Sequence, residues 1–286
     1  MFNMYLENKD GKTLQFGAST PYTITEFSGL NPPKATINTS TTATLDGGVF
    51  NSAKLQMRSV NLAFAIEENA EENRLAIYEV VQPKNPIKLY YQSDKLDVFL
   101  DGYVEEVSPD YFAKKQIVTI SILCPFPYFR SAQLIVNELS VISKMFHFPF
   151  SSEGGANASI VFGEAKSLTS VTVSNRGSVK TGLKFELYAK NQITNPKIYN
   201  YQTGEFLTVN TTIQQGDIIT ITTGQGNKTI TLLRNGAETN IFNLLDKNST
   251  WLQLDIGGGI FVYTVDGGNA ADLVVNIYHY DLFEGV

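Results

Sequence analysis

Few residues in this sequence have the types and spacing that catalysis requires. The histidines are His147 and His279, and the single cysteine is Cys124. A zinc site needs three or four His, Cys or carboxylate ligands at recognisable spacing, and no such spacing surrounds either histidine. Cys124 has no neighbouring base or basic cluster that would lower its pKa. We therefore expect no catalytic residue, no metal site, no cofactor-binding residue and no enzymatic activity.

The segment Gly224-Gln225-Gly226-Asn227-Lys228-Thr229 is the nearest approach to a phosphate-binding loop. A P-loop has a glycine four residues before Gly-Lys-Ser/Thr and a helix after it, and here the spacing is absent and a strand is expected to follow. The segment therefore predicts a turn. No Gly-x-Ser-x-Gly elbow occurs, and the acidic clusters fall at a helix start and a strand turn, which does not indicate a glycosidase pair.

Three aromatic residues in the second half of the chain offer an alternative of a different class. Tyr199, Tyr201 and Trp251 lie among short predicted strands, and aromatic rings can stack on sugar faces. Ordinary core or hairpin packing is the simpler explanation of the same residues. A carbohydrate-binding β-sandwich adhesion protein therefore stays open as the alternative function.

Length, charge and composition limit the class of protein. A chain of 286 residues is long for one core and suits two. The net charge of −6 disfavours general nucleic-acid binding, since phosphate contacts need Lys and Arg. A charged share of 17% with 12% aromatics suits protein–protein contact, and also a plain β-rich fold. With no visible signal peptide and no apolar run of membrane-spanning length, we expect a soluble protein made in the cytoplasm and no membrane partner.

Residues 117–131 form the boundary around which the chain is organised. Val118, Ile120 and Ile122 alternate with polar residues, as in a half-buried strand. Pro125 and Pro127 then remove two backbone donors and end the ladder. This pattern predicts the end of a first domain.

The residues before this boundary predict strands and one helix. The helix is expected over residues 68–81, with acidic residues at its start and an apolar stripe of Leu75, Ile77, Tyr78 and Val81. The predicted strands are residues 2–6, 13–16, 22–27, 59–66, 87–91, 96–100, 103–107 and 116–124. This order favours a β-sandwich or split barrel with one helix packed on it.

Residues 35–45 have the composition of an exposed β-hairpin arm. They are rich in Thr and Ser, have few large side chains and end at Asp46-Gly47-Gly48. A strand without an apolar face cannot hold itself against a core. We therefore expect an arm that is either flexible or ordered by a partner.

The second half of the chain predicts a β-sandwich reached through a linker. Residues 134–142 could form a strand, and His147-Phe148-Pro149-Phe150 with Gly154-Gly155 favours a linker. Beyond residue 159, short strands alternate with turns, and Asn235-Gly236 is the strongest hairpin signal in the chain. The expected domains are residues 1–130 and 159–286, joined by a linker over residues 131–158. Whether residues 273–283 belong to the second domain or return to the first stays open.

The serial order of several short motifs resembles a known family, the siphophage distal tail proteins. In the first half the motifs are Gly29-Leu30-Asn31-Pro32-Pro33, Asp46-Gly47, Arg58 before a strand, the acidic-start helix, Cys124-Pro125 and Pro127-Tyr128. In the second half they are Val171-Thr172-Val173-Ser174-Asn175-Arg176-Gly177, Asn200-Tyr201-Gln202-Thr203-Gly204 and Asn235-Gly236, and they resemble the galectin-like β-sandwich of that family. The resemblance covers nearly the whole chain.

The resemblance implies a mainly β fold and a structural role at the tip of a phage tail. The first domain, with its helix and hairpin arm, would form a hexameric ring through which viral DNA passes without specific binding. The galectin-like domain would project outward and anchor receptor-binding or baseplate proteins. The ring would join the tail tube protein to the tail-associated hub protein in a virion tail assembled in the host cytoplasm.

A closed ring uses head-to-tail interfaces, and an exposed arm can add to a neighbour's sheet. The residues that we expect at such an interface lie in the arm and on either side of it: Pro32, Pro33, Thr36, Asn38, Thr41, Thr44 and Arg58.

Overall fold

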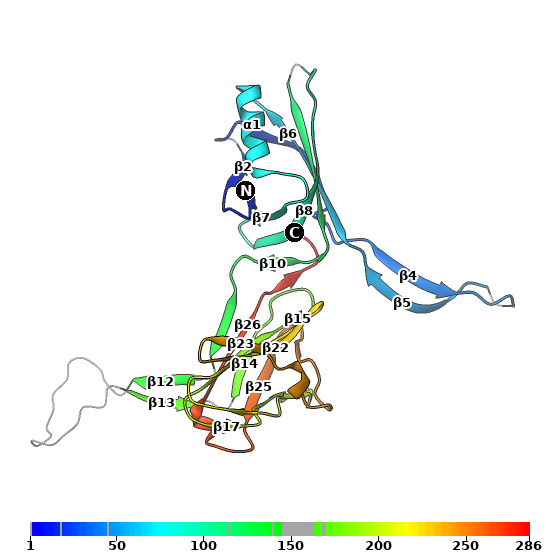
Figure 1. Cartoon of the computed structure of the whole chain (residues 1–286). Helices are drawn as coiled ribbons and strands as arrows, with labels where there is room; N and C mark the ends of the chain where they lie inside the picture. Colours follow the sequence, from blue (N-terminus) through cyan, green and yellow to red (C-terminus); the bar gives the residue numbers. More distant parts are fainter. Residues whose placement is uncertain are drawn as a thin grey trace, which may run out of the picture. The chain divides into compact units, whose positions relative to one another are not determined.

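The structure of the chain is a computed structural model that describes residues 2–17, 19–44, 46–113, 115–138, 140–144, 163–167 and 170–286 (Figure 1). It divides into two compact units. Unit 1 consists of Met1–Gln133 together with Leu282–Val286, and unit 2 consists of Leu134–Asp281. Unit 2 is therefore inserted between two segments of unit 1.

Unit 1 contains one large sheet, one α-helix and a separate two-stranded hairpin. Its helix is α1 (Ala70–Val80). Its strands are β1 (Asn3–Asn8), β2 (Thr13–Phe16), β3 (Tyr22–Ser28), β4 (Ala35–Ser40), β5 (Val49–Leu55), β6 (Arg58–Ile66), β7 (Pro86–Gln92), β8 (Asp97–Pro109), β9 (Ile117–Cys124), β10 (Phe129–Ser131) and β27 (Leu282–Phe283).

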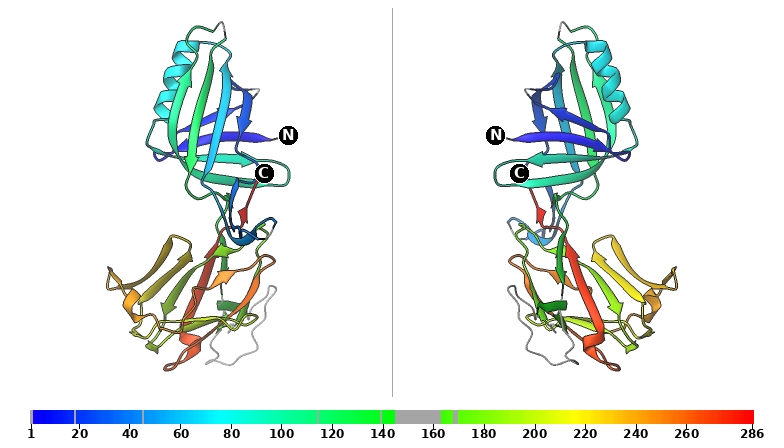
Figure 2. Two further views of the ribbon diagram at one scale, coloured as in Figure 1. Left: turned by 90° about the vertical axis from the view of Figure 1, so that its right-hand side faces the viewer. Right: turned by 90° about the vertical axis from the view of Figure 1, so that its left-hand side faces the viewer.

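The nine-stranded sheet of unit 1 runs in the order β2-β1-β7-β8-β9-β6-β3, and β10 and β27 pair off this path. In Figure 2, β1 and β7 run across the direction of β6 and β9, so the sheet bends over one core. The sheet has two ends, β2 and β3, and is not a closed barrel. This arrangement confirms the mainly β fold with one α-helix that the sequence predicts for this half.

The alternation of apolar residues in β6 and β9 explains the core of unit 1. Val60, Leu62 and Phe64 of β6 are buried, as are Val118 and Ile120 of β9. The two strands pair antiparallel, which brings their inward faces together. Pro125 follows β9, and the ladder between β6 and β9 ends at Arg58 and Cys124, as the proline rule predicts.

Helix α1 is shorter than the predicted span, although Ile77, Tyr78 and Val81 of the predicted stripe do pack in or against the core of unit 1. Its buried residues are Ile77 and Val80, while Leu75 is 55% exposed. The predicted placement of Leu75 in the core is therefore wrong. The helix packs against β1, β2 and β6. Residues two positions apart point about 200° apart around a helix, so Leu75 faces away from the core when Ile77 faces it.

Unit 2 consists of short strands and two single-turn 3-10 helices. The helices are η1 (Phe242–Leu244) and η2 (Ala270–Asp272). The strands are β11 (Ile135–Glu138), β12 (Ser140–Lys144), β13 (Gly163–Ser167), β14 (Ser170–Val173), β15 (Thr181–Gly182), β16 (Lys184–Ala189), β17 (Ile193–Thr194), β18 (Lys197–Asn200), β19 (Phe206–Thr208), β20 (Thr212–Ile213), β21 (Ile218–Gly224), β22 (Asn227–Arg234), β23 (Ala237–Asn240), β24 (Gln253–Leu254), β25 (Gly259–Thr264) and β26 (Leu273–His279).

Two antiparallel sheets face each other across the core of unit 2. One has the order β11-β26-β16-β21-β22-β23 and the other β14-β25-β18-β19. Phe185 from the first sheet meets Phe261 from the second, with ring centroids 6.0 Å apart. Between β22 and β23, Asn235 and Gly236 both have positive φ, at 51° and 79°, which is the geometry that the Asn-Gly signal predicts. Unit 2 is thus a β-sandwich.

The end of the chain returns to unit 1, which differs from the predicted domain ranges. Strand β26 belongs to unit 2, whereas β27 pairs with β10 through Phe129↔Phe283 and Arg130↔Leu282. At the other boundary, β11 pairs with β26 inside unit 2 although residues 131–158 were expected to be a linker. The paired backbone groups of β11 and β27 assign these residues to the units that contain their partners.

Several predictions fall on residues outside the described ranges. These are the linker motifs His147-Phe148-Pro149-Phe150 and Gly154-Gly155, together with Leu45 at the end of the predicted arm segment. Within the described residues, no helix is both long and apolar enough to cross a membrane.

Candidate functional site

The residues with potential chemistry are packed inside their units. Cys124 is buried, and burial raises the pKa of its thiol to about 12. His279 is buried in unit 2, where its Nε2 lies 3.0 Å from the carbonyl oxygen of Ser174 and 3.5 Å from Oδ1 of Asp281. Burial lowers the pKa of His279, against the opposing effect of Asp281. In the described part of the chain, no three His, Cys, Asp or Glu residues gather in a way that could hold a metal ion.

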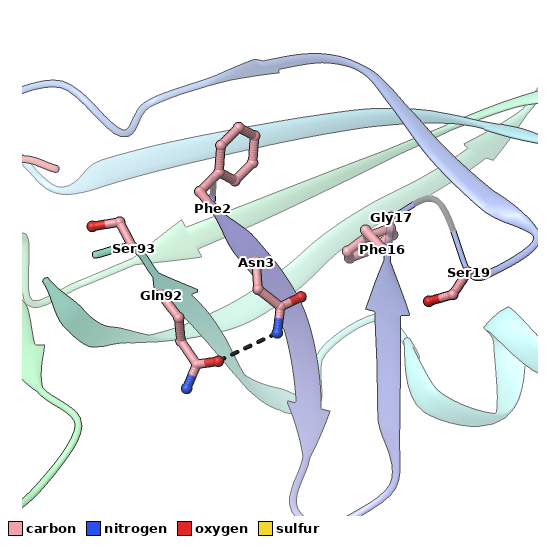
Figure 3. A pocket seen from close by; sticks show the side chains of 7 residues that line it. All are labelled: Phe2, Asn3, Phe16, Gly17, Ser19, Gln92 and Ser93. Carbon is pink, nitrogen blue, oxygen red and sulfur yellow. Dashed lines mark hydrogen bonds between the residues drawn. The ribbon is translucent and has the colours of Figure 1, made fainter. Parts of the chain in front are cut away.

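A pocket in unit 1 opens beside the start of β1 and has a volume of about 800 Å³ (Figure 3). Asn3 of β1 and Gln92 of β7 point toward one another there, with Nδ2 of Asn3 3.3 Å from Oε1 of Gln92. Beside this pocket the Phe2 ring stacks on the Tyr91 ring, with ring centroids 5.7 Å apart. The lining residues are Phe2, Asn3, Phe16, Gly17, Ser19, Gln92 and Ser93. This set offers amides, hydroxyls and aromatic faces, and it contains no acid–base group.

The aromatic residues considered for sugar stacking differ in how far their side chains are exposed to solvent. Tyr201 is 69% exposed, while Tyr199 and Trp251 are half-buried. The Trp251 ring stacks on Phe242 at 5.5 Å, and Nζ of Lys228 lies 5.4 Å from the Trp251 ring centroid. These contacts engage the indole within unit 2, so the arrangement favours a packing role for Trp251.

The hairpin of β4 and β5 is the most exposed strand pair in unit 1. Its strands pair with each other from Ala35↔Leu55 to Ser40↔Val49 and form a two-stranded sheet of their own. In Figure 1 this hairpin, which we call the arm, extends away from the large sheet of unit 1. A hairpin of two strands is marginally stable by itself in water. The arm therefore has the form of an element that is completed by a partner.

The arm has one apolar face and one polar face. Residues directly opposite in an antiparallel pair point to the same side. The register places Ile37 opposite Ala53 and Phe50 opposite Thr39, so Ile37 and Phe50 share a face. Their side chains are 62% and 63% exposed. The expectation of an arm without an apolar face is therefore wrong, because the returning strand β5 supplies Phe50.

Hydrogen bonds between side chains line the polar face of the arm. Nδ2 of Asn38 donates to Oγ of Ser52 at 2.9 Å. At the root of the arm, Nε2 of Gln56 donates to Oγ1 of Thr36 at 2.9 Å, and the backbone N–H of Gln56 donates to the carbonyl oxygen of Lys34 at 2.9 Å. These bonds hold the two strands in register and leave the apolar face free for another surface.

Arg58 lies at the root of the arm, where β6 begins. Its side chain is buried and donates from Nε to the carbonyl oxygen of Pro127 at 2.7 Å. Its Nη1 donates to the carbonyl oxygens of Gly29 and Asn31, at 2.5 and 2.7 Å, and its Nη2 donates to that of Glu284 at 2.5 Å. The guanidinium also lies 4.7 Å from the ring centroid of Phe129.

The residues expected at a subunit interface lie in two different environments. Along the arm and in the loop before it, Pro32, Asn38, Thr41 and Thr44 are exposed, and Pro33 and Thr36 are half-buried. Arg58 is only 2% exposed. Its contacts are within unit 1, and a buried guanidinium with these partners is not presented to another chain, so the structure gives no support to its place in the interface set.

Sequence reasoning missed Ile37, Val49 and Phe50 as the exposed apolar residues of the arm. Val49 and Phe50 directly follow the Gly47-Gly48 turn, a position that marks the start of a returning strand. The register shifts at Asn38/Thr39, which indicates a bulge. The bulge breaks the period-2 pattern in β5, so the apolar alternation was hidden.

Comparisons with known proteins agree with this two-unit organisation. The family described as "Phage tail protein RIFT-related domain" matches residues 9–124, and the family described as "Siphovirus-type tail component, C-terminal domain" matches residues 176–278. No curated protein matches the sequence.

Two solved structures are similar to nearly the whole chain. The SPP1 Dit protein, described as a paradigm of the hub adsorption apparatus in phages that infect Gram-positive bacteria, has 15% identity, a TM-score of 0.67 and 98% coverage of both chains. A chain of the phage P2 baseplate in its activated conformation with Ca has 13% identity, a TM-score of 0.56 and 100% coverage of both chains. At these sequence identities, the similarity shows a shared fold.

The fold and the two matched domains define a structural component of the siphovirus-type tail. The chain belongs to the siphophage distal tail protein family, as the order of its sequence motifs predicts. Its likeness to the solved hub and baseplate chains is a likeness of fold.

Proposed function

We propose that this protein forms a hexameric ring at the tip of the phage tail and that the arm joins neighbouring subunits. The observation that carries the proposal is the apolar face of the arm, with Ile37 and Phe50 more than half exposed. Burying a large apolar side chain contributes roughly 1.5–3 kcal/mol. In a ring, each arm meets the same surface of the next subunit, so this contribution repeats at every head-to-tail interface.

The polar and apolar residues of the arm have separate roles in this proposal. Backbone groups on the outer edges of β4 and β5 are available to extend a neighbour's sheet, while Ile37 and Phe50 pack on its surface. The predicted interface residues Pro32, Pro33, Thr36, Asn38, Thr41 and Thr44 remain in the proposed contact. Arg58 is removed from it, in keeping with its burial.

The two units divide the remaining tasks. Unit 1, which includes the region expected as residues 1–130, forms the ring around the path of the viral DNA, and a net charge of −6 disfavours tight binding to phosphates. Unit 2, the galectin-like β-sandwich expected over residues 159–286, anchors receptor-binding or baseplate proteins. The ring contacts the tail tube protein on one side and the tail-associated hub protein on the other, in a tail assembled in the host cytoplasm.

Size-exclusion chromatography with light scattering tests this proposal. The purified protein, alone or mixed with its tail tube and hub proteins, should elute with six times the mass of one 31.6 kDa chain per ring. If the protein remains a single chain in every mixture, even at high concentration, the proposed ring is wrong.

A further inference from the structure

Arg58 joins three segments of unit 1 that are far apart in the sequence. Its bonds reach Gly29 and Asn31 in the loop before the arm, Pro127 in the segment after β9, and Glu284 near the end of the chain. The four acceptors are backbone carbonyl oxygens, so no side-chain exchange at those positions removes them. Arg58 itself is the group on which the junction depends.

Residues 282–286 lie directly against the loop that leads into the arm. The backbone N–H of Val286 donates to the carbonyl oxygen of Leu30 at 3.2 Å. A Cβ on Gly285 would lie 2.8 Å from Cδ of Pro32, so these two backbones approach closely. Two sets of hydrogen bonds therefore connect residues 282–286 with this loop. The Arg58 side chain bonds both Glu284 and the loop, and the backbone N–H of Val286 bonds the loop directly.

The chemistry of this junction requires the planar guanidinium fork. Arginine presents five N–H donors in fixed directions, whereas the lysine ammonium is a compact charge with three donors. Nε, Nη1 and Nη2 of Arg58 reach carbonyl oxygens from three different segments. Lysine would keep the charge but could not reach these oxygens together. An apolar replacement would leave these partly buried carbonyl oxygens without the donors that Arg58 supplies.

We propose that Arg58 is the positioning residue of the arm. By binding the loop before the arm and residues 282–286 to the same group, it fixes the root of the arm and so the direction in which the face with Ile37 and Phe50 is presented. The step from arm direction to ring formation rests on the proposed function. The fixing of the root does not, because it takes place within one chain.

Hydrogen–deuterium exchange on the full chain tests the root directly. The variants are Arg58→Lys, Arg58→Met and a chain that ends at Phe283, with Arg74→Lys as the matched control. Arg74 is half-buried in unit 1, less buried than Arg58, and its Nη1 donates to Oε1 of Gln116, away from the arm. Exchange at the amide of Gln56, which donates to the carbonyl oxygen of Lys34, and at the amides of residues 29–31 and 34 should become about tenfold faster or more in the Arg58 variants, relative to the amides of β9 in the same sample.

The ratio of root exchange to core exchange separates positioning from general stabilisation. A residue that only stabilises the fold would speed exchange in the root and in β9 by the same factor, and that result would overturn the proposal. The same conclusion follows if the root is unchanged in Arg58→Lys and in the shortened chain. If Arg58→Met does not fold, exchange in Arg58→Lys and in the shortened chain still tests the proposal.

Ring formation by the same variants provides a second readout. Arg58→Lys and the chain ending at Phe283 should give a smaller fraction of rings than Arg74→Lys at equal concentration. If the unchanged protein forms no ring, the proposed function fails while the exchange result still decides the role of Arg58. If rings form normally and root exchange is unaltered, the role of Arg58 fails alone.

Discussion

The guanidinium of Arg58 donates a hydrogen bond of 2.5 Å to the carbonyl oxygen of Glu284, across 226 residues of sequence. The whole of unit 2 lies in the chain between these two residues. Unit 1 is therefore complete only when the last residues have returned to it. This connection makes the final segment part of the ring-forming unit that we propose.

Unit 1 should fold stably without unit 2 only if residues 282–286 are retained. Leu282 is buried, Phe283 and Val286 pack against the core of unit 1, and loss of a buried side chain of this size costs about 2–5 kcal/mol. A chain with residues 134–281 replaced by a short Gly-Ser linker should therefore be more stable than residues 1–133 alone by roughly that amount. Urea unfolding of the two chains measures the difference. Equal stability would show that the returning segment adds nothing.

Removing the apolar face of the arm should abolish assembly without weakening the fold. The double variant Ile37→Ser and Phe50→Ser changes two side chains that are more than half exposed, so its stability should stay within about 0.5 kcal/mol of the original. Light scattering should show single chains where the original protein gives rings. The control is Phe112→Ser, which replaces a fully exposed phenylalanine outside the arm and should leave assembly intact. Rings formed by the double variant would remove the arm from the interface.

The ion pair of Asp217 and Arg234 should make unit 2 sensitive to acid. Nε and Nη2 of Arg234 lie 2.9 and 2.5 Å from Oδ2 of Asp217, whose side chain is 4% exposed. The hydrogen bond from Arg234 holds the pKa of Asp217 below its usual range, against the effect of burial. Arg234→Met leaves a buried carboxylate without this partner and should cost roughly 1–3 kcal/mol at pH 7.

The sign of the pH effect follows from the lowered pKa of Asp217. The stabilisation is complete above the unfolded value of about 3.9 and is lost as the pH falls through the lower folded value. The difference between the original protein and Arg234→Met should therefore shrink below about pH 4. Fluorescence of Trp251, the single tryptophan, follows unfolding of unit 2, and Arg74→Lys in unit 1 is the control. A difference that stays constant down to pH 2 would contradict this role.

Cys124 should be inert in the native protein. Its thiol is buried and its pKa is raised to about 12, so near pH 8 the thiolate fraction is about a thousandfold below that of a free cysteine. Ellman's reagent should react at once in urea and very slowly without it. A Cys124→Ala chain carrying Ser59→Cys, on the exposed side of β6, supplies a matched accessible thiol. Similar native rates for the two thiols would contradict the burial of Cys124.

The sequence predicts those parts of the fold that depend on local pattern. Alternation identifies β6 and β9, the prolines after Cys124 mark the end of β9, and Asn235-Gly236 identifies the β22–β23 hairpin. Each of these signals lies within a few residues of the structure that it specifies. The order of such motifs was also sufficient to indicate the family.

The features that sequence reasoning missed depend on distant contacts or on broken periodicity. Pairing of β27 with β10 joins residues on either side of unit 2, and no local signal encodes it. The bulge in the arm hides the apolar face that Phe50 completes. Arg58 was expected at a subunit interface, and its burial follows from the carbonyl oxygens of distant segments that accept from its guanidinium.

Electron cryomicroscopy of the assembled protein tests the central proposal most directly. The predicted result is a six-fold ring in which the arm of each subunit lies on the next subunit, with Ile37 and Phe50 buried in that contact. A ring whose arms face solvent, or single chains in the presence of the tail tube and hub proteins, would contradict it.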